Sequence, residues 1–414
     1  MTKHIVFIEM SMTGAGEKAI EYSQEQGYHV TIVSRNPDKY SSILRPTTRV
    51  LQCETNNQEE LVEAVKKLDM EQKIDGITTT ADFYVPQAAL AAEALGLSGM
   101  PYKAAAHARN KYYMRLNLQK YLPHLNPTFG LVFTEEEALK MAREWGFPLI
   151  AKPQDANDSL NVIRIHTEDQ LVDYMRASKQ WKYNSAGQPY SNGVLLEGYI
   201  EGKEFSVETV QHKGGKIQLI GVTEKVLTGA KRGYFVEIGV CFPTRTPESE
   251  ILYKEVANAL RSLNIDCGVI HTECRIKDGK VKILEINPRL MGDMAGSHMI
   301  ELALGTSPIQ FVVETALGNK IPWEPKKESG AAMYGICMPQ TGLFGGIENL
   351  EEVKKMPGVA HMKVMADIGE RYYYPPLSNG DFVARLVTGG ETPEQALELA
   401  KEAAAHVKVK VIHQ

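Results

Sequence analysis

The sequence predicts a mixed α/β fold (α/β with α+β elements) made of several domains, and three observations support this prediction. The chain has 414 residues, of which 43% are hydrophobic and 23% charged. This length allows roughly two to four globular domains. The N-terminal part alternates short apolar strands with helical patterns, which is typical of a parallel sheet. The later part is rich in strands, including a hairpin at 268–276 and 280–287.

Charge and cysteine usage exclude several classes of protein. A formal net charge of −5 provides no bulk attraction for nucleic acid or anionic membranes, so neither is expected as a partner. No apolar run reaches the roughly 18 residues that span a bilayer, and the first residues read as a strand with no signal-peptide core. The five cysteines are odd in number and contain no CxxC. We expect reduced thiols and a cytoplasmic location.

The N-terminal elements are predicted as a parallel unit. A strand at 4–9 is followed by a loop at 11–16, a helix through Ala19 and Ile20, and a strand at 29–33. Gly14 and Gly16 form half of a dinucleotide fingerprint, but a tight turn into the helix explains them better, because the third glycine and the acidic residue are missing. A further strand at 74–77 and an Ala-rich helix at 88–95 complete the unit.

A new segment begins near Asn110, and its elements follow in order. A helix is predicted at 135–145, followed by strands at 149–152 and 161–165 that flank a polar loop at 153–160. Further predictions are strands at 194–197, 204–210, 217–224 and 234–238, and a helix at 248–263. The composition shifts after Pro325, and residues 329–414 hold short strands and a last helix that begins at Thr392-Pro393.

The hairpin carries the most specific chemistry. Glu285 and Asn287 are two residues apart on one strand, and Glu273 lies on the other strand. Oxygen donors of this kind suit Mg²⁺, which binds one or two carboxylates together with substrate phosphates. Arg289 follows within reach of the same anion. The alternative is a surface hairpin whose charges are solvated.

The register of this hairpin tests the metal hypothesis. A two-residue turn at Asp278-Gly279 would pair 277 with 280 and 273 with 284, which separates Glu273 from Glu285. A three-residue loop, 277–279, would instead pair 273 with 283 and bring the two carboxylates to one face. The opposite face would then be apolar: Ile270, Cys274, Ile276, Leu284 and Ile286. We therefore predict the three-residue loop.

Together with other motifs, this hairpin resembles that of the ATP-grasp ligases, and the resemblance extends over roughly residues 1–410. Glu285-Ile-Asn-Pro-Arg289, preceded by Glu273, is similar to the metal-binding hairpin of the family. Lys152 resembles the lysine that contacts ATP phosphate, and Lys111 resembles the second nucleotide lysine. The segment 195–207 is similar to the hinge, which implies that Glu197 receives the adenine amino group, Tyr199 and Ile200 offer backbone groups, and Glu204 lies near the ribose.

The resemblance implies three domains and a nucleotide partner. They are an N-terminal Rossmann-like domain at 1–108, a central ATP-grasp lid at 109–200, and a C-terminal ATP-grasp domain at 201–414 with a closing subdomain from about 329. The implied ligands are ATP and Mg²⁺, for which Mn²⁺ can substitute. One departure is the loop 154–161, which lacks the glycines of many family members. Ser159 is expected to cap phosphate there.

A second resemblance concerns the subgroup. The segment around Lys225 and Phe235-Val-Glu237-Ile-Gly resembles that of bacterial L-amino acid ligases, which join two unprotected amino acids into a dipeptide. It implies that Glu237, Lys225 and Gly292 belong to the substrate pocket. Glu237 either holds an ammonium group or is a strand-end carboxylate. Val240 stands where the subgroup often has His; if it lines the pocket, the amine donor should be small or apolar.

The implied reaction is ATP-dependent ligation through an acyl phosphate, with release of ADP and phosphate. Arg289 would stabilise the transferred phosphoryl group. The expected partners are amino acids, whose pocket should depend on the loops 82–86 and 291–298. A homodimer is expected because dimers are common in similar enzymes. Three alternatives stay open: a carboxylate–amine ligase of purine or cofactor synthesis, a biotin-dependent carboxylase subunit, and a nucleotide-binding module without activity.

Overall fold

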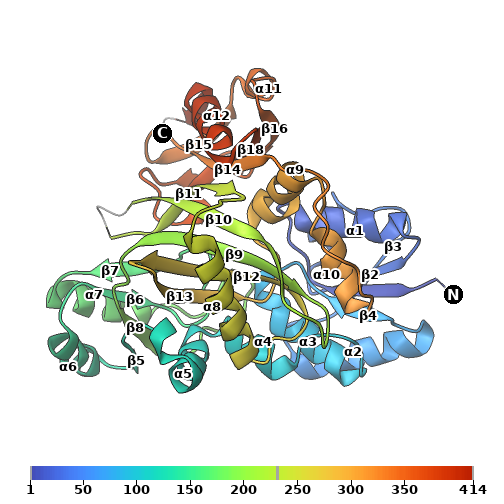
Figure 1. Ribbon diagram of the computed structural model, residues 1–414, viewed down its shortest axis with the longest axis horizontal. Helices are drawn as coiled ribbons and strands as arrows, with labels where there is room; N and C mark the ends of the chain where they lie inside the picture. Colours follow the sequence, from blue (N-terminus) through green and yellow to red (C-terminus); the bar gives the residue numbers. More distant parts are fainter. Residues whose placement is uncertain (1, 230–232, 413–414) are drawn as a thin grey trace.

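The N-terminal part of the chain forms a parallel sheet covered by helices. The computed structural model describes residues 2–229 and 233–412. The strand order is β3 (Thr48–Gln52), β2 (His29–Ser34), β1 (His4–Ile8) and β4 (Gly76–Thr78), all parallel. Helix α1 (Ala15–Glu25) connects β1 to β2, α2 (Gln58–Glu71) connects β3 to β4, and α3 (Val85–Ala94) follows β4 (Figure 1). Gly14 precedes α1 with a φ of 124°, which confirms the predicted tight turn.

A second sheet forms in the middle of the chain. Its strand order is β5 (Phe129–Val132), β8 (Val194–Gly198), β6 (Leu149–Lys152) and β7 (Ile163–Ile165), with antiparallel pairing throughout. Helices α6 (Glu135–Trp145) and α7 (Glu168–Ser178) contribute Ala138 and Leu171 to the core of this unit. A capping box between Thr134 and Glu137 begins α6.

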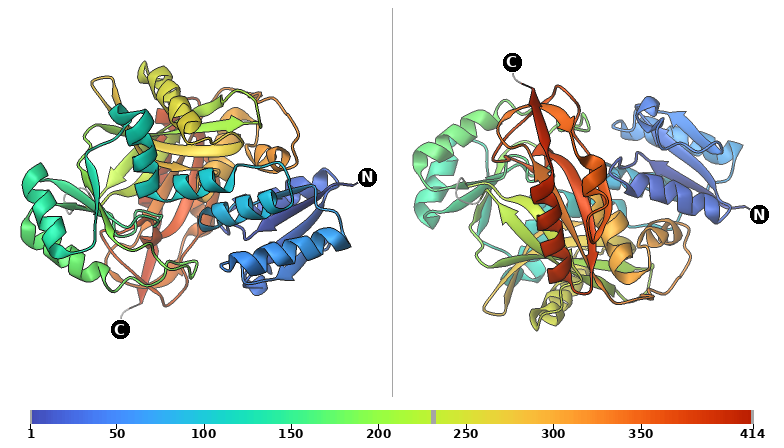
Figure 2. Two further views of the ribbon diagram at one scale, coloured as in Figure 1. Left: turned by 90° about the horizontal axis from the view of Figure 1, so that it is seen from below. Right: turned by 90° about the horizontal axis from the view of Figure 1, so that it is seen from above.

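The largest sheet has eight strands. Its order is β13 (Lys280–Asn287), β12 (Gly268–Lys277), β9 (Lys203–Gln211), β10 (Gln218–Thr228), β11 (Val236–Phe242), β14 (Gly330–Cys337), β18 (Phe382–Gly390) and β16 (Val359–Val364). Three of these strands come from the region after residue 329, so this region extends the same sheet. Figure 2 shows the N-terminal unit and the middle unit on opposite sides of the large sheet.

Helices cover the large sheet and join it to the other units. Helix α8 (Glu248–Ser262) packs against β9 and β12, and α12 (Pro393–His406) packs against β14 and β18 (Figure 1). Helices α4 (Tyr102–Arg109) and α5 (Lys111–Tyr121) lead from the N-terminal unit to the middle unit. Helix α9 (Ile300–Leu304) is followed by α10 (Ile309–Ala316), which returns to α1. A small sheet, β17 (Arg371–Tyr372), β15 (Gly342–Ile347) and β19 (Val409–Ile412), lies near the C-terminus.

The mixed α/β prediction is confirmed, whereas the domain limits stay predictions. The elements that were not predicted are strands β3 and β5 and helices α2, α4, α5, α7, α9, α10 and α11 (Leu350–Val353). Capping residues do mark two of them, Asn57 before α2 and Thr167 before α7. In the described residues no helix is long and apolar enough to cross a membrane. All five cysteines are free thiols, as expected.

The predicted hairpin register is wrong, yet its consequence holds. Lys277 pairs with Lys280 across a two-residue turn in which Asp278 and Gly279 both have positive φ. A β-bulge then shifts the register, so that Cys274 pairs with Ile283 and Glu273 with Glu285. The extra residue, Leu284, faces the cleft and not the core, contrary to our prediction. The bulge therefore returns both carboxylates to one face.

Candidate active site

A single cleft gathers the residues that the sequence singled out. It lies where the hairpin β12–β13, the middle sheet and the segment after Arg289 meet, and it encloses about 1230 Å³ including its open part. The predicted residues that line it are Lys111, Lys152, Ser159, Glu197, Tyr199, Ile200, Glu204, Lys225, Glu237, Glu273, Glu285, Arg289 and Gly292. Asn287 does not line the cleft, but its Nδ2 donates to Glu285 Oε1 at 2.9 Å. The roles of these residues stay predictions.

The two hairpin carboxylates each face a lysine. Glu285 Oε2 lies 2.9 Å from Lys111 Nζ, and Glu273 Oε1 lies 2.8 Å from Lys225 Nζ. Burial alone would raise the pKa of Glu285, but Lys111 lowers it. Burial acts in the same way on Glu273, and Lys225 and His271 hold its pKa well below the usual range. Both groups are therefore anions that attract cations.

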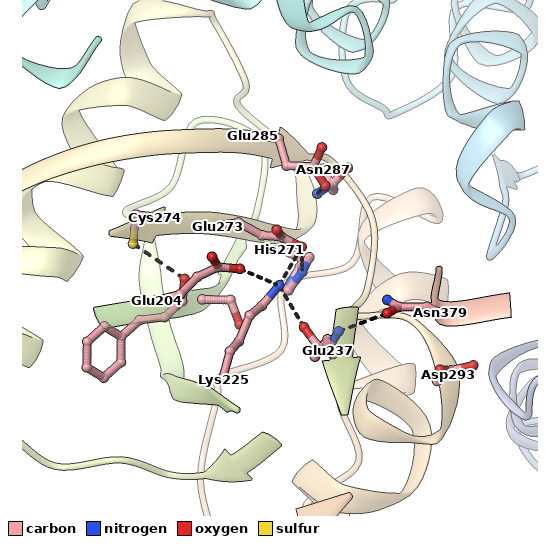
Figure 3. A network of polar contacts seen from close by, with 12 residues as sticks. Glu204, Lys225, Glu237, His271, Glu273, Cys274, Glu285, Asn287, Asp293 and Asn379 are labelled. Carbon is pink, nitrogen blue, oxygen red and sulfur yellow. Dashed lines mark hydrogen bonds and ion pairs between the residues drawn. The ribbon is translucent and has the colours of Figure 1, made fainter. Parts of the chain in front are cut away.

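Lys225 is the centre of a buried charge cluster, which Figure 3 shows from close by. Its Nζ lies 2.8 Å from Glu237 Oε2, 2.8 Å from Glu273 Oε1 and 3.8 Å from Glu204 Oε1. Burial would lower the pKa of Lys225, but the three carboxylates raise it well above its ordinary value. One lysine therefore holds three acidic side chains from β9, β11 and β12 together.

His271 extends this cluster into the sheet. Its Nδ1 is 2.8 Å from Glu208 Oε1, and its Nε2 is 3.0 Å from Glu273 Oε1. Burial would lower the pKa of His271, but the two carboxylates raise it to about 9. The ring is thus protonated at neutral pH and orients Glu273.

The end of the cleft beside β6 and β8 contains a second buried cluster. Glu197 Oε2 lies 2.8 Å from Lys152 Nζ, and Glu197 Oε1 accepts from Arg115 Nε at 2.6 Å. Burial would raise the pKa of Glu197, but Arg115 and Lys152 lower it to about 2. Burial in turn lowers the pKa of Lys152. Both carboxylate oxygens of Glu197 are engaged by cations.

The hinge after β8 is held by Arg275, which the sequence analysis missed. Its Nη1 donates to the carbonyl of Ile200 at 2.5 Å, and its Nη2 lies 2.9 Å from Glu204 Oε2. The guanidinium also lies over the rings of Tyr199 and Phe235, at 5.4 and 5.2 Å from their centroids. Residues two apart on a strand share a face, so the position of Glu273 on β12 could have predicted that Arg275 lies beside the site.

The loop 153–160, which is expected to contact phosphate and which we call the phosphate loop, turns without glycine. Asp158, Ser159 and the following Asn161 have φ values of 54°, 56° and 59°, a conformation that L-residues rarely adopt. Lys111 Nζ donates to the carbonyl of Ala156 at 2.8 Å and so ties the loop to α5. The backbone of this loop therefore adopts conformations that glycines would supply in a glycine-rich loop.

Arg289 is oriented by the N-terminal unit. Its Nε donates to Asp82 Oδ1 at 2.8 Å, and Arg109 Nη2 lies 3.0 Å from Asp82 Oδ2. Burial would raise the pKa of Asp82, but the two arginines lower it to about 2. The carboxylate is therefore an anion that holds Arg289 toward the cleft. The loop Asp82–Pro86, expected from the sequence to shape the pocket, supplies this contact.

The region after residue 329 also reaches the cleft, which sequence reasoning missed. Asn379 lines it, and Arg385 Nη2 lies 2.9 Å from Asp293 Oδ2. Arg385 is almost fully buried, and its guanidinium lies 4.1 Å from the ring centroid of Phe382. No local motif marks either residue, because both act over long sequence separations.

Val240 does not line the cleft. Its exposed fraction is 0%, and it packs in the core with Val210, Phe242 and Val269. Glu237, on the same strand, is the residue that faces the cleft. Position 240 was expected to select the amine donor only if it lined the pocket, and this condition is not met because Val240 lies in the core. A register shift between β10 and β11 near Glu237 accompanies this arrangement.

Comparisons with known proteins agree with this geometry. The family model of the ATP-grasp domain matches residues 145–298, that of the ATP-grasp N-terminal domain matches 20–99, and that of L-amino acid ligase C-terminal domain 2 matches 335–411. The carbamoyl phosphate synthase large chain of Caldanaerobacter subterraneus subsp. tengcongensis is 30% identical over 234 residues, which are 55% of this chain and 20% of that protein. This chain thus spans about a fifth of that relative.

Solved structures share the fold over the full length. The L-amino acid ligase from Bacillus licheniformis has a TM-score of 0.83 at 23% identity, covering 100% of this chain and 99% of that one. Phosphoribosylglycinamide synthetase from Anaerococcus prevotii has a TM-score of 0.72 at 18% identity, covering 100% of both chains. Three family models thus match in chain order on this fold: the chain contains an ATP-grasp N-terminal domain, an ATP-grasp domain and, at 335–411, a C-terminal domain of the L-amino acid ligase kind.

Proposed function

We propose that this protein is an ADP-forming carboxylate–amine ligase that joins two unprotected L-amino acids into a dipeptide. The observation that carries the proposal is one cleft lined both by the cations of Lys111, Lys152 and Arg289 and by the carboxylates of Glu273 and Glu285. A triphosphate needs several cations, and two carboxylates suit the metal that accompanies it. The C-terminal domain matched at 335–411 favours the amino acid ligase over other members of the superfamily.

The reaction would run in two steps. A carboxylate oxygen of the first amino acid attacks the γ-phosphorus of ATP, the bond to ADP breaks, and an acyl phosphate forms. The amine of the second amino acid then attacks the acyl carbon and loses a proton, while the carbon–oxygen bond breaks and phosphate leaves with the carboxylate oxygen. Arg289, held by Asp82, would stabilise negative charge in both steps.

The donor set of the hairpin fits Mg²⁺. Glu273 and Glu285 are neighbours across β12 and β13, and Asn287 is bonded to Glu285, so the site offers oxygen ligands of the kind this ion prefers. Among the described residues no group of three or more His, Cys, Asp and Glu could hold a metal by itself, which agrees with a site that substrate phosphates complete. Mg²⁺ would neutralise phosphate charge there.

At the other end, Glu237 is our candidate for the ammonium group of an amino acid. It lines the cleft while Lys225 occupies one of its oxygens at 2.8 Å. The second candidate is a ligase of purine synthesis, which the similarity to phosphoribosylglycinamide synthetase favours.

Isotope transfer tests the proposal. Pairs of amino acids are screened for ADP and phosphate release, and the first amino acid is then labelled with oxygen-18 in its carboxylate. We expect the label to appear in the released phosphate, because the acyl phosphate passes a carboxylate oxygen to it. Formation of AMP with the label retained by the peptide would contradict the acyl-phosphate route. Phosphate release only with a ribosyl-phosphate amine would favour the second candidate.

A further inference from the structure

A residue of the C-terminal domain joins two sides of the cleft. Asn379 lies in the short turn Asn379–Asp381, within the segment matched at 335–411. Its Oδ1 accepts the backbone N–H of Glu237 at 3.0 Å, and its own N–H donates to the carbonyl of Asp158 at 3.2 Å. Figure 3 shows Asn379 beside Glu237. One residue therefore connects the phosphate loop to the strand that carries Glu237.

The N–H of Glu237 depends on this contact. Strand β14 pairs with β11 only from Gly239 to Phe242, so Glu237 lies beyond the end of that ladder. The register of β11 on its other neighbour, β10, also shifts here. The side-chain oxygen of Asn379 thus takes the place of a missing strand partner, and it fixes the backbone from which the Glu237 side chain enters the cleft.

The phosphate loop also requires stabilising contacts from outside the loop. Asp158 and Ser159 have left-handed φ values that side chains disfavour, and the loop has no glycine to relax the strain. Asn379 meets the loop at Asp158. The turn that presents Asn379 is itself stiff, because the Asp381 carboxylate accepts the N–H groups of Tyr373, Leu377 and Ser378 at 3.2, 2.8 and 3.1 Å.

We propose that Asn379 is a positioning residue that clasps the phosphate loop to the Glu237 strand and keeps water from the acyl phosphate. The inference rests on the proposed function. If water enters, its oxygen attacks the acyl carbon and loses a proton, the carbon–oxygen bond to phosphate breaks, and amino acid and phosphate leave without a peptide bond. The clasp would thus set how tightly ATP use is coupled to ligation.

Two variants of Asn379 and one control test the clasp. Asn379→Ala removes the acceptor, whereas Asn379→Asp keeps an oxygen in its place. Asn349→Ala is the matched control in the same domain: Asn349 also accepts a backbone N–H through its side-chain oxygen, from Lys408 N at 2.9 Å, and it donates to His406 O at 2.8 Å, but it does not line the cleft. Hydrogen exchange of peptides covering 236–242 and 153–162 is measured in each protein.

In Asn379→Ala we expect faster exchange in 236–242, because the N–H of Glu237 loses its side-chain acceptor. A smaller increase is expected in 153–162, because the backbone N–H of residue 379 still reaches Asp158 while its turn is no longer anchored to β11. Protection should be restored in Asn379→Asp and unchanged in Asn349→Ala. Phosphate released per dipeptide should be near one in the wild type and at least about twofold higher in Asn379→Ala. Unchanged exchange in Asn379→Ala would overturn the clasp. Faster exchange with an unchanged ratio would overturn its role against water. Should the wild type make no dipeptide, the proposed function fails, and exchange alone decides the clasp.

Discussion

Substitution of Glu285 tests the hypothesis of a metal site most directly. Its carboxylate faces Lys111 at 2.9 Å and accepts from Asn287 at 2.9 Å, so the side chain is already oriented toward the cleft. Glu285→Gln keeps this shape but removes the charge that a divalent cation needs. Because loss of an outer partner alone costs about 10–100-fold, we expect turnover at limiting Mg²⁺ to fall by more than about 100-fold.

Steady-state rates across a magnesium titration measure this effect, and Glu201→Gln is the control. Glu201 pairs with Lys277 at the surface, outside the cleft. Near-normal activity of Glu285→Gln at limiting magnesium would remove Glu285 from the metal site.

A second test at the level of single residues concerns Lys152. Its Nζ pairs with Glu197 and is expected to contact phosphate as well. In Lys152→Ala the Glu197 carboxylate keeps Arg115 as a partner, so the fold should persist. A buried phosphate would lose a charge-assisted bond worth about 1.5–3 kcal/mol, which is about a 10- to 150-fold loss of ATP affinity.

Calorimetry of ATP binding measures this loss after circular dichroism has shown a folded variant. Lys179→Ala, at an exposed lysine that pairs with Glu135, should bind ATP as the wild type does. An unchanged dissociation constant in Lys152→Ala would exclude the lysine from the nucleotide site.

At the scale of elements, Arg115 connects a helix to two sheets. It lies on α5, is 0% exposed, and bonds to Glu197 on β8 and to the carbonyls of Ile283 and Leu284 on β13 at 2.7 and 3.0 Å. Arg115→Met leaves Glu197 with Lys152 as its one cationic partner and removes the donor to two buried carbonyls, so the free energy of unfolding should fall by about 3–5 kcal/mol. Denaturant unfolding measures it.

The surface pair of Arg143 with Glu168 is the matched control. Both side chains are largely exposed, at 64% and 42%, so Arg143→Met should cost no more than about 1 kcal/mol. Equal losses of unfolding free energy in Arg115→Met and Arg143→Met would show that the buried cluster stabilises the fold no more than a surface ion pair does.

The same cluster predicts a pH dependence. The pKa of Glu197 falls from 4.5 to about 2 on folding. A carboxyl group whose pKa is lowered by folding contributes stability that is complete above pH 4.5 and is lost as the pH falls toward 2. Wild-type stability should therefore drop more steeply over this range than that of Arg115→Met, in which less of the shift remains. Parallel stability curves would contradict this assignment.

At the scale of the whole molecule, the loop around Ala186 in the middle unit contacts the N-terminal unit. The carbonyl of Ala186 accepts Arg35 Nη1 at 2.7 Å, Asn56 Nδ2 at 3.0 Å and Tyr84 OH at 3.4 Å. The same loop reaches the phosphate loop, because Ser191 N donates to Asp155 Oδ2 at 2.9 Å. Contact between the two units thus extends to the site.

We expect Arg35→Ala combined with Asn56→Ala to weaken the contact between the loop around Ala186 and the N-terminal unit. Trypsin should then cut faster after Lys182, at the edge of this loop, and ATP should protect the wild type more than the variant. Arg45→Ala, which removes an exposed pair with Glu21 in the same unit, serves as the control. Equal cleavage rates in all three proteins would show that the loop is held by other contacts.

Local chemistry determined much of this protein from its sequence. Apolar periodicity predicted most strands before residue 290 and the helices α1, α3, α6, α8 and α12, because burial of one face requires it. The spacing of Glu285, Asn287 and Arg289 predicted oxygen ligands and a cation at one end of the hairpin, since residues two apart on a strand share a face. The Asp278-Gly279 pair also indicated the two-residue turn that forms, but we set this signal aside for a three-residue loop, because the turn alone would have separated the two carboxylates.

Tertiary structure decided which way side chains face and which distant residues meet. The bulge at Leu284 restored the shared face that the two-residue turn alone would have lost, and periodicity within a strand contains no signal for it. Val240 was assigned to the core by the strands packed around it. Asn379 reaches Glu237 over 142 positions of sequence. Such contacts arise only when separate elements pack, so no local pattern encodes them.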